Sequence, residues 1–297
     1  MNQKSMVIGI GELLWDVFPD HKQMGGAPCN FAYHVSRLGT DSLAISAIGH
    51  DELGDEIIRK LNAAGLHYDI QQLKHNTGIV QVTLSGDGIP QYEICQPVAW
   101  DFIGMKPEYT ELAKAAKAIC FGSLAQRSEV SRATIRQFSA LVPATALKIF
   151  DINLRQQFYS KTLIEESLNL CNVLKINDDE IKIVANMFEL KGNDEQNCKT
   201  LLQQFNLKMV ALTCGTNGSY LISPKETSYM ETPKVQVADT VGAGDSFTAA
   251  MVVGLLAGKP LKEAHQMAVA LSAFVCTQHG AMPEYKKEKI VSLLNGE

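Results

Sequence analysis

The stretch DTVGAGDSF, residues 239–247, carries the strongest information in this chain about both its fold and its function. Gly242, Ala243 and Gly244 are all small, and they lead directly into Asp245 and an apolar run. The N-terminus of a helix presents unpaired amides and binds anions, and glycines allow a phosphate to approach the backbone. A carboxylate in a first turn is also a common helix cap. The local pattern therefore leaves two alternatives, a capped turn or an anion site beside a carboxylate.

Short apolar runs alternate with segments of helical spacing along the rest of the chain. The runs interpreted as strands are residues 6–10, 42–49, 117–122, 147–153, 173–177 and 209–215, together with VQVA at 235–238. The segments interpreted as helices are residues 30–39, 51–66, 194–205 and 245–258. Strands that alternate with helices form a parallel sheet covered on both faces. We therefore predict an α/β fold with a central, mostly parallel sheet.

Two early segments depart from this alternation. Residues 12–24 and 78–94 show period-two patterns, and the second contains a Gly-Asp-Gly turn, so both are interpreted as antiparallel hairpins. We expect them to form a small β-sheet that projects from the main body. No linker-like stretch is visible, so residues 1–297 are interpreted as a single domain, with lid segments at approximately 12–24 and 78–98.

Composition excludes several classes of protein. Apolar residues make up 46% of the 297 residues and charged residues 20%, which is typical of a globular protein. The net charge of −5 and the absence of a dense basic cluster argue against a nucleic-acid partner. Seven scattered cysteines without a C-x-x-C pair argue against disulfides and zinc. No apolar run is long enough to span a membrane. We expect a soluble, cytoplasmic protein.

The common nucleotide-binding motifs are absent. GLLAGKP at residues 254–260 is one residue too short for a P-loop, and Pro260 stands where the hydroxyl residue belongs. GIGELLW at residues 9–15 has Leu14 in place of the third glycine of a dinucleotide motif. The loops of protein kinases are missing as well. A P-loop enzyme and a dinucleotide dehydrogenase are therefore disfavoured.

Five motifs in order resemble the ribokinase (PfkB) family of carbohydrate kinases. DTVGAGDSF is similar to that family's C-terminal signature, and GGAPCNFA at residues 25–32 to its N-terminal one. KINDDE (175–180) matches its N-x-x-E motif, TCGTNG (213–218) its T-x-G-x-x-G loop, and HGAMP (279–283) falls in the expected place. The resemblance covers nearly the whole chain. It implies a ribokinase-like fold with a β-sheet lid, and transfer of the γ-phosphoryl group of ATP to a primary hydroxyl of a sugar.

The resemblance also assigns catalytic roles. Asp245 would be the general base, and the amides of Gly242, Ala243 and Gly244 would hold the charge of the transferring phosphoryl group. The resemblance also implies which residues bind Mg²⁺ and the nucleotide. Mg²⁺ would be ordered through water by Asn177 and Glu180, and the nucleotide would lie against Asn177, Thr213, Gly215, Thr216, Gly218, Gly244, His279 and Gly280. For NDDE, an ordinary acidic helix cap remains the local alternative.

A potassium ion is a further expectation. Asp239 and Val241 match the first half of a monovalent-cation site found in many relatives, and the 275–284 loop would supply the rest. Glu284 stands where ribokinase-like relatives often have a serine, so this chain departs from the pattern at that position.

The sugar side of the site is implied by three matched positions. Asp16, Gly26 and Asn30 match residues that hydrogen-bond sugar hydroxyls. Arg155, in DINLR at residues 151–155, is placed near the substrate or the transferring phosphate, with a surface ion pair as the alternative. His34 is interpreted as a surface residue on the polar side of its helix.

The GGAP and VAWD stretches resemble the fructokinase branch. Trp100 in VAWD (98–101) would form an apolar wall over the sugar, with a core or dimer contact as the alternative. Ala27 stands where kinases of phosphosugars have a lysine, which indicates an uncharged substrate. Fructose is the predicted sugar; ribose, 2-keto-3-deoxygluconate and nucleosides remain open, as does a non-catalytic regulator that binds sugar or nucleotide. An exposed lid face suggests a homodimer by analogy to relatives.

Overall fold

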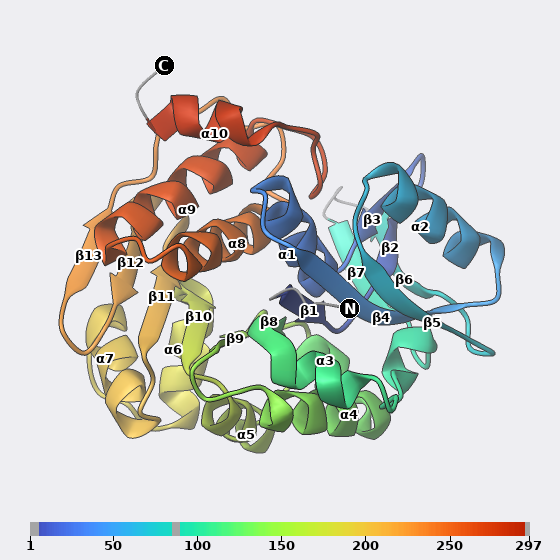
Figure 1. Ribbon diagram of the computed structural model, residues 1–297, viewed down its shortest axis with the longest axis horizontal. Helices are drawn as coiled ribbons and strands as arrows, with labels where there is room; N and C mark the ends of the chain where they lie inside the picture. The colour runs from blue at the N-terminus through green and yellow to red at the C-terminus, as the bar shows by residue number, and fades with distance from the viewer. Residues whose placement is uncertain (1–5, 85–89, 295–297) are drawn as a thin grey trace.

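The computed structural model describes residues 6–84 and 90–294. Its main sheet has nine strands in the order β13-β12-β11-β10-β9-β8-β1-β4-β5 (Figure 1). The parallel strands are β1 (Met6–Ile10), β4 (Ser42–Gly49), β5 (Tyr68–Leu73), β8 (Ala116–Phe121), β9 (Leu147–Asp151), β10 (Val173–Asn177) and β11 (Met209–Thr213). Two antiparallel strands, β12 (Ser219–Ile222) and β13 (Thr227–Met230), complete one edge.

Helices cover both faces of this sheet, as Figure 1 shows. One face carries α1 (Ala27–Arg37), α2 (Glu52–Ala63), α8 (Ala243–Leu256), α9 (Leu261–Cys276) and α10 (Lys287–Leu294). The other carries α3 (Tyr109–Ala115), α4 (Glu129–Leu141), α5 (Lys161–Leu170), α6 (Asp178–Met187) and α7 (Asp194–Gln204). Successive residues of a strand point to opposite faces of the sheet. Val7 therefore packs against the face covered by α1 and α8, and Ile8 against the face covered by α3 to α7. The predicted α/β fold is confirmed.

A second, smaller sheet has the order β3-β2-β6-β7. It is built from β2 (Leu14–Val17), β3 (Lys22–Gly25), β6 (Gly78–Leu84) and β7 (Pro90–Ile94). Both predicted hairpins are antiparallel, and the two are joined by parallel pairing of β2 with β6. The predicted Gly-Asp-Gly turn, residues 86–88, lies outside the described residues. The small sheet thus combines segments that are far apart in the sequence.

One predicted strand is wrong. Residues 235–238 form no strand, and the side chains of Val235 and Val237 are 37% and 58% exposed. The segment is held by Ala238 N, which donates to the carbonyl of Cys276 at the end of α9. Alternating valines indicate a strand only where a neighbouring strand is available to pair with them. The helix that follows begins at Ala243, two residues earlier than predicted.

The carboxyl ends of the parallel strands bring the candidate residues to one edge of the sheet. Asp151 ends β9, Asn177 ends β10 and Thr213 ends β11. Ligands of open α/β sheets bind in the crevice outside these strand ends. Within residues 6–84 and 90–294, no helix has the length and apolar character needed to cross a membrane.

Candidate active site

The first turns of α1 and α8 meet at a direct side-chain contact. Asn30 Nδ2 donates to Asp245 Oδ2 over 2.8 Å, although the two residues are 215 positions apart in the chain. Asn30 is only 4% exposed. The two signature motifs of the sequence therefore form one site, as their assignment to sugar binding and catalysis requires.

The surroundings of Asp245 bring the pKa of its carboxyl group close to neutral pH. Burial is the largest cause, and with the neighbouring carboxylates of Asp151 and Glu12 it raises the pKa of Asp245 to about 7. The hydrogen bond from Asn30 and the charge of Lys175 oppose this rise. A general base works best when its pKa lies near the working pH. Asp245 is therefore well suited to accept a proton from a hydroxyl group.

The turn before Asp245 needs glycine at residue 242 for two reasons. Gly242 has φ 78°, in the left-handed region, and a Cβ there would lie 2.7 Å from Cα of Ala281. The first-turn amides of a helix lack partners within the helix. Of the predicted anion-binding amides, Ala243 N donates to the carbonyl of Thr240 over 3.2 Å. The turn thus packs closely against Ala281.

A buried ion pair that the sequence reasoning missed lies beside this turn. Lys175 Nζ is 3.3 Å from Asp151 Oδ1, and the two side chains are 9% and 6% exposed. Asp151 Oδ2 also accepts a hydrogen bond from Thr248 Oγ1 in α8 over 3.0 Å. Burial alone would lower the pKa of Lys175, but Asp151, Glu180 and Asp245 raise it, so the ammonium stays charged. A lysine inside the apolar run VLKIN was the available signal.

The predicted sugar-binding side of the site includes Asp16 on β2. Burial raises the pKa of Asp16 to about 6, while the positive charge of Arg155 opposes this rise. Arg155 itself is exposed and lies close enough to Asp16 and Glu12 to act on the pKa of both. Gly26 has φ 133°, and a Cβ there would lie 2.5 Å from the carbonyl oxygen of Glu12. The absence of a side chain at Gly26 therefore allows the start of α1 to pack against the Glu12–Leu13 segment that follows β1.

Glu12 and Asn30 each carry a buried acceptor atom without a partner in the described part of the chain. Glu12 Oε2 and Asn30 Oδ1 make no hydrogen bond to any described residue. Burial raises the pKa of Glu12, although backbone donors and Arg155 act against this. Buried polar atoms are normally satisfied, so unpartnered acceptors fit a ligand that brings several hydroxyl donors. Glu12 was not among the predicted site residues; its signal was a carboxylate directly after a buried strand.

Asn177 and Glu180 form the capping box of α6. Asn177 Oδ1 accepts from the amides of Asp179 and Glu180, while Glu180 Oε2 accepts from Asn177 N and Oε1 from Leu154 N. The local alternative, a helix cap, is thus present in the structure. No cluster of three or more His, Cys, Asp or Glu side chains in the described part of the chain is arranged to hold a metal. One carboxylate and one amide fit a Mg²⁺ ion that keeps most of its waters.

The predicted nucleotide loop follows β11. Gly215 and Gly218 have φ 51° and 94°, which few other residues adopt, and Thr216 between them is exposed. A Cβ at Gly218 would lie 2.5 Å from the carbonyl oxygen of Met230. Thr213 is half-buried at the end of the strand. Both glycines of the matched motif are therefore required by the backbone.

Asp239 joins the two segments of the predicted potassium site. Its Oδ1 accepts from Val241 N over 3.0 Å and its Oδ2 from Gly280 N over 3.1 Å. The neighbouring His279 is exposed and, with Gly280, lines a cavity of about 330 Å³ that also involves Lys22 of β3. The carboxylate thus holds the 239–241 and 279–280 segments together.

Two expectations are corrected by burial. Trp100 is fully buried, and the guanidinium of Arg127 lies 3.9 Å from its ring while pairing with Asp101, so Trp100 belongs to the core and forms no open wall over a sugar. His34 is fully buried as well, between the hydroxyl of Tyr285 and the carbonyl of Ala281. Its helix face is covered by a segment about 250 residues away, which the local pattern of α1 does not reveal.

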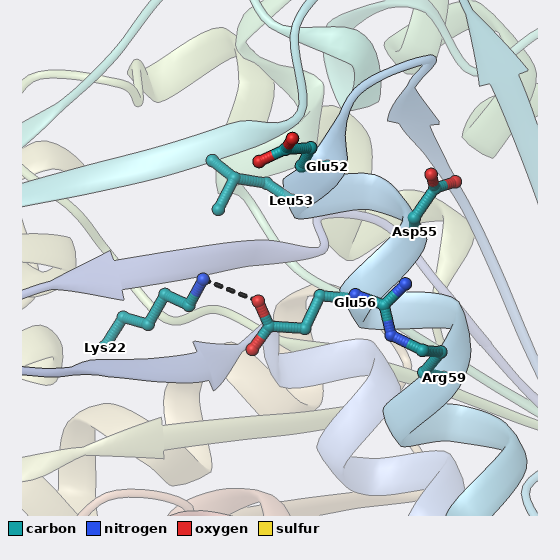
Figure 2. Close-up of a pocket in the computed structure, with 6 residues that line it drawn as sticks. All are labelled: Lys22, Glu52, Leu53, Asp55, Glu56 and Arg59. Carbon is teal, nitrogen blue, oxygen red and sulfur yellow. Dashed lines mark hydrogen bonds and ion pairs between the residues drawn. The ribbon is translucent and has the colours of Figure 1, made fainter.

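A further pocket of about 360 Å³ lies between β3 and α2 (Figure 2). Figure 2 shows Lys22 reaching Glu56 across it, with Nζ 2.6 Å from Oε2. The remaining lining residues are Glu52, Leu53, Asp55 and Arg59. None of these belongs to the predicted site. The ion pair instead links the small sheet to α2.

Comparison with known proteins agrees with this geometry. The family model described as pfkB family carbohydrate kinase matches residues 10–288. The chain belongs to this family. An uncharacterized sugar kinase of Pyrococcus horikoshii is 29% identical over 308 residues, covering 96% of this chain and 94% of the relative, and its crystal structure aligns with a TM-score of 0.81.

One further relative and one further solved structure, both named fructokinases, are similar to this chain. A protein of Arabidopsis thaliana named "Probable fructokinase-7" is 30% identical over 320 residues, covering 95% of this chain and 90% of the relative. A fructokinase of Xylella fastidiosa with bound ATP aligns over 100% of this chain and 99% of its own, with a TM-score of 0.84 at 20% identity, which supports the fold alone. The protein is thus a carbohydrate kinase of the pfkB family with the ribokinase-type fold.

Proposed function

We propose that this pfkB kinase phosphorylates fructose at its primary hydroxyl to give fructose 6-phosphate. The observation that supports the proposal is the contact between Asn30 and Asp245, in which a carboxylate with a pKa of about 7 lies beside the side-chain amide that we assign to sugar binding. In the reaction, the sugar hydroxyl gives its proton to Asp245 as its oxygen bonds to the γ-phosphorus. The bond from that phosphorus to the bridging oxygen breaks, and ADP leaves.

The chain's own residues have separate tasks in this reaction. The amides of Gly242 and Gly244 and the N-terminal dipole of α8 stabilise the charge on the transferring group, and the amide of Ala243 joins them only when it leaves the carbonyl of Thr240. Asp16, Gly26 and Asn30 hold the sugar hydroxyls, and Arg155 lies on the same side. Thr213, Gly215, Thr216, Gly218 and the His279–Gly280 segment hold the nucleotide. Mg²⁺, ordered through water near Asn177 and Glu180, neutralises phosphate charge when bound.

The charge of the site supports a neutral sugar. Asp151 raises the pKa of Glu12, and Asp151 and Glu12 together raise that of Asp245. Two cations act in the opposite direction: Lys175 lowers the pKa of Asp245, and Arg155 lowers those of Glu12 and Asp16. An acidic sugar such as 2-keto-3-deoxygluconate would add a further negative charge. Unpartnered buried acceptors instead match the hydroxyl donors of a polyol. The fructokinase names among the relatives favour fructose among neutral sugars.

Three further features belong to the same proposal. The small sheet closes over bound sugar and keeps water from the phosphoryl group. The exposed face of the small sheet forms the contact of a homodimer. Each chain folds as a single catalytic domain. A potassium ion near Asp239 and Val241 would share the Asp239 carboxylate with two backbone hydrogen bonds, and Glu284 stands where the family pattern has another residue.

The test is Mg-ATP turnover against fructose, ribose, glucose, 2-keto-3-deoxygluconate, fructose 6-phosphate and adenosine, with and without KCl. We expect fructose to give the highest kcat/KM. Preference for another compound would retain the kinase mechanism and overturn the choice of sugar. Turnover of none, with nucleotide or sugar still bound, would instead favour a non-catalytic regulator.

A further inference from the structure

The ammonium group of Lys175 lies directly against the turn that carries the catalytic base. A Cβ placed on Gly244 would be 3.0 Å from Lys175 Nζ, so the absence of a side chain at residue 244 makes room for this ammonium. Lys175 reaches this point from β10, whereas Gly244 and Asp245 begin α8. A buried positive charge thus sits beside the position where the phosphoryl group would be transferred.

Asp151 fixes Lys175 in this place. Its Oδ1 lies 3.3 Å from Lys175 Nζ, and its Oδ2 accepts a hydrogen bond from Thr248 Oγ1 over 3.0 Å. The same hydroxyl of Thr248 contacts the carbonyl oxygen of Gly244 over 3.0 Å. Lys175, Asp151, Thr248 and Gly244 therefore form a closed set of contacts that ties β9 and β10 to the first turn of α8.

We propose that Lys175 is a positioning residue for phosphoryl transfer: held by Asp151, its ammonium keeps the first turn of α8 in place and offsets the negative charge that gathers around Asp245. Asp151 acts as its anchor. This role deepens the kinase function proposed above and rests on Asp245 being the base. No other role has been assigned to Lys175 or to Asp151 in the reaction.

The electrostatic surroundings explain why a charge, and not only a side chain of suitable length, is needed at residue 175. Asp245 is faced by ionisable or polar groups from five other segments: Glu12 after β1, Cys29 and Asn30 of α1, Cys120 of β8, Asp151 of β9 and Lys175 of β10. Among the groups acting on Asp245, Lys175 is the cation. Charges interact strongly in such a site because little water screens them. Removing the ammonium would leave the carboxylates and the incoming phosphate to repel one another.

The experiment compares Lys175→Met, Asp151→Asn and the double variant with the wild-type protein. Lys182→Met, an exposed lysine paired with Asp179 on α6, is the matched control. All proteins are assayed with the sugar that the wild-type protein phosphorylates fastest, so an error in the choice of fructose changes the substrate and not the comparison. The readouts are kcat, KM for sugar and the dependence of kcat/KM on pH.

We expect Lys175→Met to lower kcat by on the order of 10²-fold, as loss of one stabilising group in an anion hole does. The KM for sugar should change much less. The acidic limb of the pH profile should move upward in Lys175→Met and downward in Asp151→Asn, because the two charges act on Asp245 in opposite directions. A purely structural role would move neither limb. Lys182→Met should match the wild type.

The double variant keeps the proposal falsifiable if Lys175→Met folds poorly. It removes both buried charges together, so no unpaired charge remains to destabilise the core. We expect it to fold and to stay slow, because the ammonium is still missing. If its kcat and pH profile return to those of the wild type, Lys175 only neutralises Asp151 and the proposal is overturned. Equal behaviour of Lys175→Met and Lys182→Met would overturn it as well.

Discussion

The side-chain amide of Asn30 donates to the carboxylate of Asp245 over 2.8 Å, and this contact joins the first turns of α1 and α8. One partner belongs to the predicted sugar-binding motif and the other to the predicted catalytic motif. In the proposed function, the residue that holds the base would also bind the sugar. Sugar binding and proton transfer would then be coupled through this one hydrogen bond.

Replacing Asp245 with asparagine should abolish most turnover and leave the fold intact. General-base catalysis contributes about 10²–10⁴-fold, so kcat should fall at least into that range. Asparagine keeps the size of the side chain and still accepts the hydrogen bond from Asn30. Steady-state assays alongside circular dichroism check both points. Near-normal turnover would remove Asp245 as the base.

The same variant should be more stable than the wild type at alkaline pH. The pKa of Asp245 is raised from 3.8 to about 7 in the folded protein, so the wild type loses stability as the pH rises through this interval. The gain from asparagine should be absent below pH 3.8 and complete above pH 7, on the order of 1–4 kcal/mol. Urea unfolding at pH 5 and pH 8 measures it. A gain that is equal at both values would contradict the raised pKa.

Asn30→Ala should move the acidic limb of the pH–rate profile upward. The hydrogen bond from Asn30 lowers the pKa of Asp245, so its loss leaves the carboxyl protonated to a higher pH. We expect a shift of roughly one unit at most, since one neutral hydrogen bond is lost, together with a higher KM for sugar. Profiles of kcat/KM between pH 5.5 and about 9 would reveal it. An unchanged limb would mean that another group controls the profile.

Gly242→Ala and Gly258→Ala form a matched pair of substitutions. Both glycines have φ in the left-handed region, 78° and 73°, so each alanine adds about 1–2 kcal/mol of backbone strain. A Cβ at Gly242 meets Ala281, whereas a Cβ at Gly258 has nothing within 4 Å. We expect only Gly242→Ala to lose activity by more than about tenfold, and to lose the greater stability. Thermal unfolding and turnover of both variants test this; equal losses would show that contact with Ala281 is unimportant.

The main strands could be predicted because they are buried on both faces. Residues 6–10, 42–49 and 173–177 match β1, β4 and β10 residue for residue. Three strands of the main sheet were missed. β5 and β13 form its two edges, are partly exposed and carry polar residues, and β12, which lies between β13 and β11, has only four residues. Such strands have no continuous apolar run, and their pairing depends on neighbours that a local pattern does not identify.

The motifs of the candidate site can be recognised in the sequence, whereas the contacts of Lys175 and Glu12 cannot. Glycine motifs and Asp245 are recognisable because backbone geometry requires particular residues there. Lys175 and Glu12 gain their roles only through residues from other strands, and neither role is visible in a short stretch. Trp100 was misplaced for a related reason, since Arg127, which covers its ring, is distant from it in sequence. Tertiary contacts, not propensities, decide these positions.

His34 provides a prediction about acid stability. It contacts Ala281 O through Nε2 and Tyr285 Oη through Nδ1, both over 2.9 Å. A carbonyl only accepts, so Nε2 carries the hydrogen and Nδ1 accepts from the tyrosine. Burial lowers the pKa of His34 from 6.5 to about 4, so the stability that the neutral ring contributes is present above pH 6.5 and is lost as the pH falls toward 4.

Replacing His34 with glutamine, which does not titrate, should flatten this loss. The wild type should lose up to about 3 kcal/mol between pH 6.5 and pH 4 from this group, and the variant should lack that share. Burial also lowers the pKa of His265, so the variant should still lose some stability as the pH falls. His67→Gln, at an exposed position, is the control. Urea unfolding at several pH values gives the slope of the free energy of unfolding against pH. If this slope is unchanged in His34→Gln, the buried imidazole makes no contribution to it, and other groups cause the acid sensitivity.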